Sequence, residues 1–222
     1  MADVARACSS HGASPGTLDA AAIYCAICEN PGPFALVDPF MAHVLACAIS
    51  VGVVEAAEFR DNVSEAIGLD KDALARIIEN WLPEARHVIS LDAQSTSISL
   101  DEEETQVREL LERYRVDDSD ATSWITSIVT RRSMAPRHLW QDLGLFNRDE
   151  LTRLLKRWHP GLASQNIDNM KWKKFFYRKL CELEGFSLCA APTCRECGDF
   201  NSCFGDEGGE SALARLTQGR RA

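Results

Sequence analysis

The chain has 222 residues, 45% of them hydrophobic, and a net charge of −9, which suits one globular domain or two small ones. The acidic balance argues against a nucleic-acid-binding protein. The start of the chain lacks the apolar core of a secretory signal, and the most apolar run, residues 44–54, is too short to span a bilayer. We therefore expect a soluble cytoplasmic protein with no membrane partner, in which nine cysteines indicate metal or redox chemistry rather than cross-links.

Cap and turn residues divide the chain into a series of predicted helices. Residues 1–16 are rich in Ala, Ser and Gly and are expected to be disordered. Helices are predicted over residues 18–29, 40–59, 62–67, 70–81, 101–115, 120–133, 138–143, 148–158 and 168–184. Period-two alternation is largely absent. The predicted fold class is therefore all-α, a multi-helix bundle with a C-terminal cysteine-rich metal-binding loop.

Two of the predicted helices resemble each other in sequence. Residues 68–83 and 144–160 share Asp, Leu, Arg, Trp and Pro at a constant offset. A duplicated helical hairpin accounts for this likeness, and so does a chance similarity between two capped amphipathic helices.

Charge is unevenly distributed along the chain and suggests a division into parts. Residues 17–130 form an acidic helical part, and residues 131–205 form a basic helical part that carries the cysteine-rich loop. Residues 206–222 are expected to form a flexible tail. Between residues 131 and 181 there are 12 basic and 4 acidic side chains. Such a block attracts anions or an acidic partner surface, although a solvated helix face explains most charge runs.

Four cysteines within fifteen residues form the densest chemical motif. They follow the pattern C-x4-C-x2-C-x5-C, and Pro192 and Gly198 within it predict a loop. Thiolates select zinc, Cu(I) or iron–sulfur clusters. The spacings between the first three cysteines match the run that holds a plant-type iron–sulfur centre, whereas zinc sites more often pair two knuckles across a long spacer. An iron–sulfur cluster is thus favoured over a structural zinc loop. The candidate ligands are Cys189, Cys194, Cys197 and Cys203.

The last third of the chain resembles the NifQ family of nitrogen-fixation proteins. The resemblance covers about residues 130–205, and its cysteine spacing shows no departure from the family pattern. It rests on the segments Arg137-His138-Leu139-Trp140-Gln141-Asp142-Leu143-Gly144-Leu145, Asn169-Met170-Lys171-Trp172-Lys173-Lys174-Phe175-Phe176-Tyr177 and Leu180-Cys181-Glu182, and on the cysteine loop through Phe204-Gly205.

This resemblance implies a metal-cluster donor rather than an enzyme. Such a protein processes molybdate into a molybdenum–iron–sulfur (Mo–Fe–S) cluster and donates molybdenum for the iron–molybdenum cofactor (FeMo-co) of nitrogenase. The implied partners are the nitrogenase iron protein and the cofactor scaffold complex. A positive approach would help the molybdate oxyanion. The basic residues expected to supply it are Arg131, Arg132, Arg137, Lys171, Lys173 and Lys174.

Two more residues are candidate ligands with simpler alternatives. Cys181 is an extra ligand, a bridge to a second cluster, or a buried core cysteine. His138, in the Arg-His-Leu-Trp motif, is a molybdenum ligand, a hydrogen-bond donor to an oxo group, or only a capping or packing side chain. Two other functions stay open for the whole protein: a small iron–sulfur electron-transfer protein, and a zinc-stabilised helical interaction module.

Overall fold

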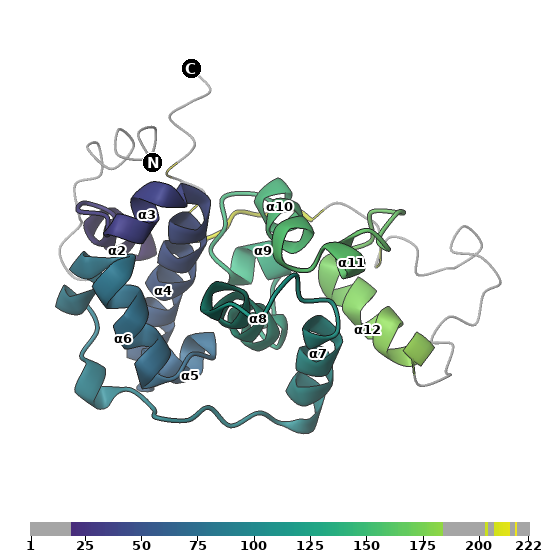
Figure 1. Cartoon of the computed structure of the whole chain (residues 1–222), viewed down its shortest axis with the longest axis horizontal. Coiled ribbons are helices and arrows are strands. Elements are labelled where there is room, and N and C mark those ends of the chain that lie inside the picture. Colours follow the sequence, from purple (N-terminus) through teal and green to yellow (C-terminus); the bar gives the residue numbers. More distant parts are fainter. Residues whose placement is uncertain (1–18, 184–202, 204–206, 214–215, 217–222) are drawn as a thin grey trace, which may run out of the picture.

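The structure, a computed structural model, describes residues 19–183, 203, 207–213 and 216 (Figure 1). Within these residues all regular elements are helices, and no strand is present. The predicted all-α class is confirmed, while the cysteine-rich loop, apart from Cys203, lies outside the described residues. In chain order the helices are α2 (Ala20–Ile27), α3 (Pro33–Val37), α4 (Pro39–Phe59), α5 (Val63–Ile67), α6 (Lys71–Asn80), the 3-10 helices η1 (Pro83–His87) and η2 (Leu91–Ala93), α7 (Glu102–Glu112), α8 (Asp120–Ser133), α9 (Leu139–Asp142), α10 (Arg148–Trp158), α11 (Pro160–Ala163) and α12 (Trp172–Leu183).

Polar side chains cap the helices close to where the sequence predicts. The carboxylate of Asp70 accepts a hydrogen bond of 2.8 Å from the Ala73 N–H and begins α6. The amide oxygen of Asn147 accepts one of 3.0 Å from the Glu150 N–H and begins α10. Asp38 likewise caps α4, in front of a proline at the first helical position. Each cap satisfies a backbone donor that the helix itself leaves unpaired.

The predicted start of the last helix is wrong. Helix α12 begins at Trp172 rather than at a cap on Asp168, because residues 166–170 form a turn of their own. In this turn the Asn166 side chain bonds both the N–H and the carbonyl of Met170, at 2.8 and 2.9 Å. Asn169 adopts a left-handed backbone conformation with φ +55°. Asn tolerates this conformation better than most residues.

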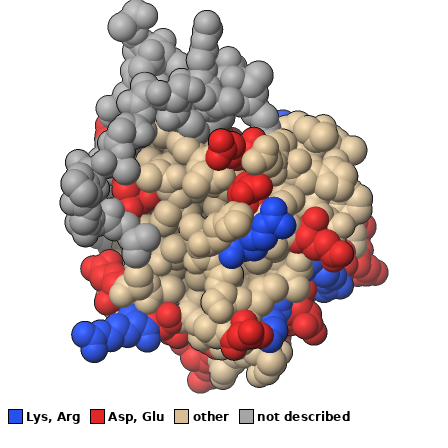
Figure 2. Space-filling model, turned by 90° about the vertical axis from the view of Figure 1, so that its left-hand side faces the viewer, with Lys and Arg blue, Asp and Glu red and all other residues tan. Residues whose placement is uncertain are grey.

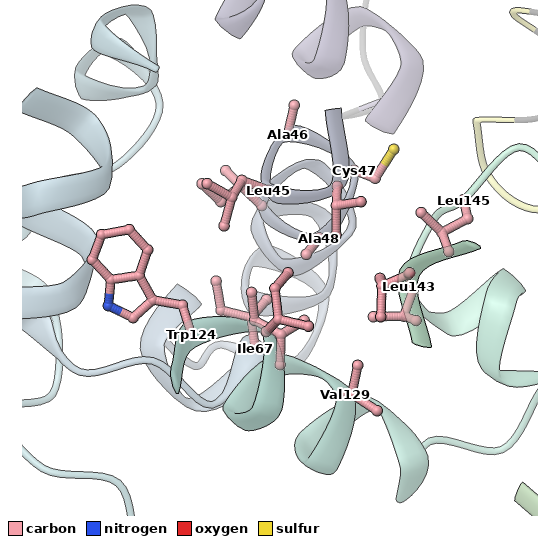
Figure 3. Close-up of a cluster of buried hydrophobic side chains, with 14 of the residues drawn as sticks. Leu45, Ala46, Cys47, Ala48, Ile67, Trp124, Val129, Leu143 and Leu145 are labelled. Atoms are coloured by element: carbon pink, nitrogen blue, oxygen red, sulfur yellow. The ribbon is translucent and has the colours of Figure 1, made fainter. Parts of the chain in front are cut away.

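Helix α4 is the central element of the core. Figure 3 shows Leu45, Ala46, Cys47 and Ala48 on this helix, surrounded by Ile67, Trp124, Val129, Leu143 and Leu145 from other elements. Among the described residues, α4 is the one helix long and apolar enough to cross a membrane, since it extends the 44–54 run to 21 residues. However, 83% of its most apolar window is buried inside the protein, as in the core helix of a globular fold.

The two similar sequence segments form similar structures. In each, a short helix ends at a glycine with positive φ, 73° at Gly68 and 71° at Gly144, and a capped amphipathic helix follows. Both glycines lie against another helix. A Cβ on Gly144 would lie 3.0 Å from the Cys47 carbonyl oxygen of α4, and one on Gly68 would lie 3.0 Å from the Ser127 carbonyl oxygen of α8. The likeness in sequence therefore extends to backbone conformation and packing.

Part of the C-terminal segment, for which the sequence predicts a flexible tail, packs on the helical body. Residues 207–213 run beside α9 and α10 (yellow in Figure 1). Ser211 is buried and Leu213 is fully buried in the main hydrophobic core. The Gln141 side chain donates a hydrogen bond of 3.2 Å to the Gly208 carbonyl oxygen. These contacts join the chain just beyond the cysteine motif to α9.

Candidate functional site

Cys203 is the motif cysteine that the structure describes. It is half-buried against the core, and its backbone carbonyl accepts a hydrogen bond of 2.9 Å from the Lys171 N–H at the start of α12. The predicted ligands Cys189, Cys194 and Cys197 lie outside the described residues. The chain therefore leaves the C-terminal end of α12 after Leu183 and is back beside its N-terminal end at Cys203.

Cys181 lies at the opposite end of α12 from Cys203. It is half-buried in the last turn of the helix and forms no disulfide. Ten residues separate it from Lys171, which corresponds to about 15 Å along the helix axis. Because helix N–H groups point towards the N-terminus, the bond from Lys171 places the Cys203 carbonyl still farther from Cys181. The structure does not bring these two thiols together.

His138 is the residue that precedes α9. Its backbone N–H donates a hydrogen bond of 3.2 Å to the side-chain oxygen of Gln141, which ties the first turn of the helix to its start. About a third of its side chain is exposed, and its Nδ1 atom lies 3.7 Å from the Glu207 carboxylate. His138 thus occupies the capping position that the sequence offered as the simpler alternative, while its ring faces a carboxylate.

Glu207 links His138 to the turn that holds Cys203. Its second carboxylate oxygen lies 3.1 Å from Nε of Arg148, and only 8% of the side chain is exposed. The two terminal nitrogens of Arg148 donate to the side-chain and backbone oxygens of Asn169 and to the Met170 carbonyl, at 2.7 to 3.0 Å. The residue after Met170 is the backbone partner of Cys203. His138 and Cys203 are therefore fixed to one connected set of polar contacts.

Carboxylates neutralise most of the basic block that the sequence suggested as an approach for anions. Arg132 is almost fully buried and makes two bonds with Glu55. Arg131 pairs with Glu104 at 2.8 Å. These carboxylates come from the acidic part of the chain, so the two charged parts pair with each other. On the face shown in Figure 2, too, acidic and basic side chains are interspersed.

The fully buried carboxylate of Asp142 binds two more members of the block. Lys173 lies 2.6 Å from one oxygen, and Nε of Arg137 lies 3.2 Å from the other. Lys173 also donates to the Ala135 carbonyl. Burial lowers the pKa of Lys173 from its ordinary value, and the bond to Asp142 acts in the opposite direction. Lys173 therefore ties α12 to α9 rather than facing an incoming anion; Lys174, the next residue, is exposed.

Two cysteines outside the motif belong to a polar cluster in the core. The Tyr24 hydroxyl and His43 Nδ1 are 2.8 Å apart, and Nε2 of the same ring lies 3.1 Å from Glu150. Burial raises the pKa of Cys28 to about 12 and that of Cys47 well above its usual value. Both thiols are therefore protonated at neutral pH and are poor metal ligands, since thiolates bind metals.

Within the described residues, no three His, Cys, Asp or Glu side chains converge so that they could hold a metal ion. Three of the motif cysteines, Cys189, Cys194 and Cys197, lie outside these residues. Cys203 is the motif cysteine within the described residues. His138 is linked to it through the same connected set of polar contacts.

A comparison with known protein families covers the segment that contains the cysteine motif. The sequence profile of the NifQ family matches residues 44–205. The chain belongs to the NifQ family. The matched span contains all six candidate ligands, and membership gives the protein a role in nitrogen fixation.

Several relatives cover most of the chain. The "Protein NifQ homolog" of Sinorhizobium fredii is 42% identical over 78% of this chain and 75% of its own length. "Protein NifQ" of Rhodobacter capsulatus is 35% identical over 79% of this chain and 93% of its own. "Protein NifQ" of Azotobacter vinelandii is 36% identical over 64% of this chain and 78% of its own. No solved structure matches this NifQ-family chain.

Sequence reasoning did not single out the acidic partners of the site. Glu207 and Glu55 carry no motif of their own, and Asp142 lies in a segment of the family resemblance without a role assigned to it. Each contacts residues far away in the chain or in another element. The one available signal was the charge segregation, because a strongly basic block beside a strongly acidic part can pair internally as well as attract a ligand.

Proposed function

We propose that this NifQ-family protein is a molybdenum-binding iron–sulfur protein that processes molybdate into a Mo–Fe–S cluster and donates molybdenum for iron–molybdenum cofactor biosynthesis. It acts as a carrier of metal rather than as an enzyme, in the cytoplasm. Its partners are the nitrogenase iron protein and the cofactor scaffold complex. The observation that carries the proposal is the family match, whose span includes the whole C-x4-C-x2-C-x5-C motif.

The surroundings of Cys203 suit a donor. Thiolates bind iron and reduced molybdenum alike. A metal bound in an accessible segment is released more readily than a metal bound in a core. Cys203 is only half-buried, and its backbone carbonyl accepts a hydrogen bond from the Lys171 N–H. In this proposal Cys189, Cys194, Cys197 and Cys203 hold the iron of the cluster, and molybdenum is held more weakly.

The ion pairs of the basic block change one part of the expected mechanism. Arg131, Arg132, Arg137 and Lys173 are each paired with carboxylates, so an incoming molybdate would have to compete with Glu104, Glu55 and Asp142 for them. Their proposed role is therefore structural: they hold α8, α9 and α12 to the rest of the helical body. The exposed Lys174 keeps a role in attracting the anion.

Donation is tested by transfer. Protein purified without oxygen and loaded with molybdenum is incubated with a molybdenum-free scaffold complex and the iron protein, and the scaffold is re-isolated for elemental analysis. The proposal predicts molybdenum in the scaffold fraction. It predicts none there when the donor is a variant in which all four motif cysteines are replaced by alanine. Cys28→Ala serves as the control for thiol loss, since Cys28 lies outside the motif. Reversible one-electron reduction without metal transfer would instead indicate an electron-transfer protein.

A further inference from the structure

The carboxylate of Glu207 is held from two sides in a nearly buried position. One oxygen lies 3.7 Å from Nδ1 of His138, and the other lies 3.1 Å from Nε of Arg148. Only 8% of the side chain is exposed. A nearly buried carboxylate needs compensating partners, and Arg148 supplies a permanent positive charge. Charge contacts with residues of the helical body therefore place the Glu207 carboxylate between His138 and Arg148.

Arg148 is itself anchored. It stands at the start of α10, and its terminal nitrogens reach Asn169 and the Met170 carbonyl. The turn that contains these two residues is closed by the Asn166 side chain and leads directly to Lys171, the backbone partner of Cys203. The contacts of Glu207 thus rest on α10 and on a well-bonded turn, which is the kind of support that a positioned side chain needs.

The position of this carboxylate has a consequence for the imidazole of His138. A separation of 3.7 Å is longer than a hydrogen bond, but the charge acts over that distance. A neutral imidazole carries its proton on one nitrogen and a lone pair on the other. A carboxylate beside Nδ1 repels a lone pair there and attracts an N–H. This contact favours the neutral ring that carries its proton on Nδ1 and its lone pair on Nε2.

We propose that Glu207, four positions after the last motif cysteine in the sequence, is a positioning residue that holds His138 in the Nδ1–H tautomer, with Nε2 available to bind metal. Metal-binding histidines commonly have this arrangement, in which a carboxylate fixes the nitrogen that does not bind the metal. The assignment of molybdenum as the metal rests on the proposed function. The tautomer itself does not, because it exists in the metal-free protein.

Nuclear magnetic resonance of histidine-labelled, metal-free protein tests the proposal at a pH where the rings are neutral. The chain has five histidines, and His138→Gln identifies the signal of His138. We expect the wild-type ring in the Nδ1–H form and a shift towards the Nε2–H form in Glu207→Gln, which keeps the shape of the side chain but removes its charge. Glu102→Gln, the same change at an exposed position of α7, should leave the signal unchanged.

The opposite results overturn the proposal. A wild-type Nε2–H tautomer, an unchanged signal in Glu207→Gln, or an equal change in Glu102→Gln would mean that Glu207 only fastens the C-terminal segment. If Glu207→Gln does not fold, the wild-type tautomer decides alone. In protein that carries molybdenum, Glu207→Gln should weaken molybdenum retention about 10- to 100-fold and leave iron unchanged. If the wild type carries no molybdenum, the proposed function fails while the tautomer result still stands.

Discussion

The guanidinium of Arg132 binds the carboxylate of Glu55 through two hydrogen bonds, of 2.5 and 2.7 Å, although 77 positions separate the two residues in the chain. The same guanidinium donates to the carbonyls of Ala66 and Asp142. One buried arginine thus connects α4, the end of α5, α8 and the end of α9. This pairing is the clearest sign that the basic block stabilises the fold.

Removal of this arginine should destabilise the protein strongly. Arg132→Met leaves Glu55 and two carbonyls without their donor, and breaking a buried ion pair on one side costs about 3–5 kcal/mol in free energy of unfolding. The double variant Arg132→Met/Glu55→Met should lose less than the sum of the two single variants, because no charge is left unpaired. Urea unfolding followed by circular dichroism measures all three. Additive losses would contradict the coupling.

Two neighbouring lysines of α12 offer a matched comparison. Lys173 reaches the buried Asp142, whereas Lys174 is exposed. Lys173→Met removes a donor to a charged, buried acceptor and should lower the free energy of unfolding by about 1–3 kcal/mol. Lys174→Met should change it by less than about 0.5 kcal/mol. Equal effects of the two changes on urea unfolding would argue against a structural role for Lys173.

His159 should make stability depend on pH in the mildly acidic range. Burial, with a smaller contribution from Arg115, lowers the pKa of His159 from 6.5 to about 4. Below pH 6.5 the unfolded chain binds a proton at His159, whereas the folded chain binds this proton only near pH 4. The stabilising contribution is therefore complete above pH 6.5 and is lost between these values, by up to about 1.4 kcal/mol per pH unit.

A variant comparison isolates this contribution from the other groups that titrate. His159→Gln cannot be protonated, so its free energy of unfolding in urea should fall less steeply from pH 6.5 to 4.5 than that of the wild type. Parallel curves for the two proteins would show that His159 does not carry the pH dependence.

Cys181 and Cys203 should differ in their effect on bound iron. Because they lie at opposite ends of α12, about 15 Å apart along the axis, Cys181 is too far away to share one small cluster with Cys203. Iron content after anaerobic purification should fall in Cys203→Ala and stay at the wild-type level in Cys181→Ala. A similar loss in both variants would mean that Cys181 ligates a cluster and that the loaded protein is arranged differently.

Much of the fold follows from local signals in the sequence. Asp70, Asn147 and Gly68 set helix ends that short-range rules describe, and the apolar run inside α4 predicts a buried helix. The start of α12 was misplaced because Asn166 closes a turn through its side chain, which competes with a cap at Asp168. Local rules do not weigh such competitors.

For the candidate site, the sequence proposes ligands but not the residues that surround them. Cysteine spacing indicates a metal-binding motif, but it says nothing about what supports it. Glu207 binds Arg148, and Lys171 binds the carbonyl of Cys203, through contacts between segments that are distant in the sequence. The sequence also predicted that the basic residues form a surface for anions. It does not show that Glu55 and Asp142 lie against them.

Elemental analysis of the wild-type protein, purified without oxygen from cells supplied with molybdate, tests the central claim most directly. The account predicts iron, sulfide and molybdenum together on the protein, with iron and molybdenum both lost in the variant that lacks Cys189, Cys194, Cys197 and Cys203. Tightly bound zinc with neither iron nor molybdenum would contradict it and would identify the motif as a structural zinc loop.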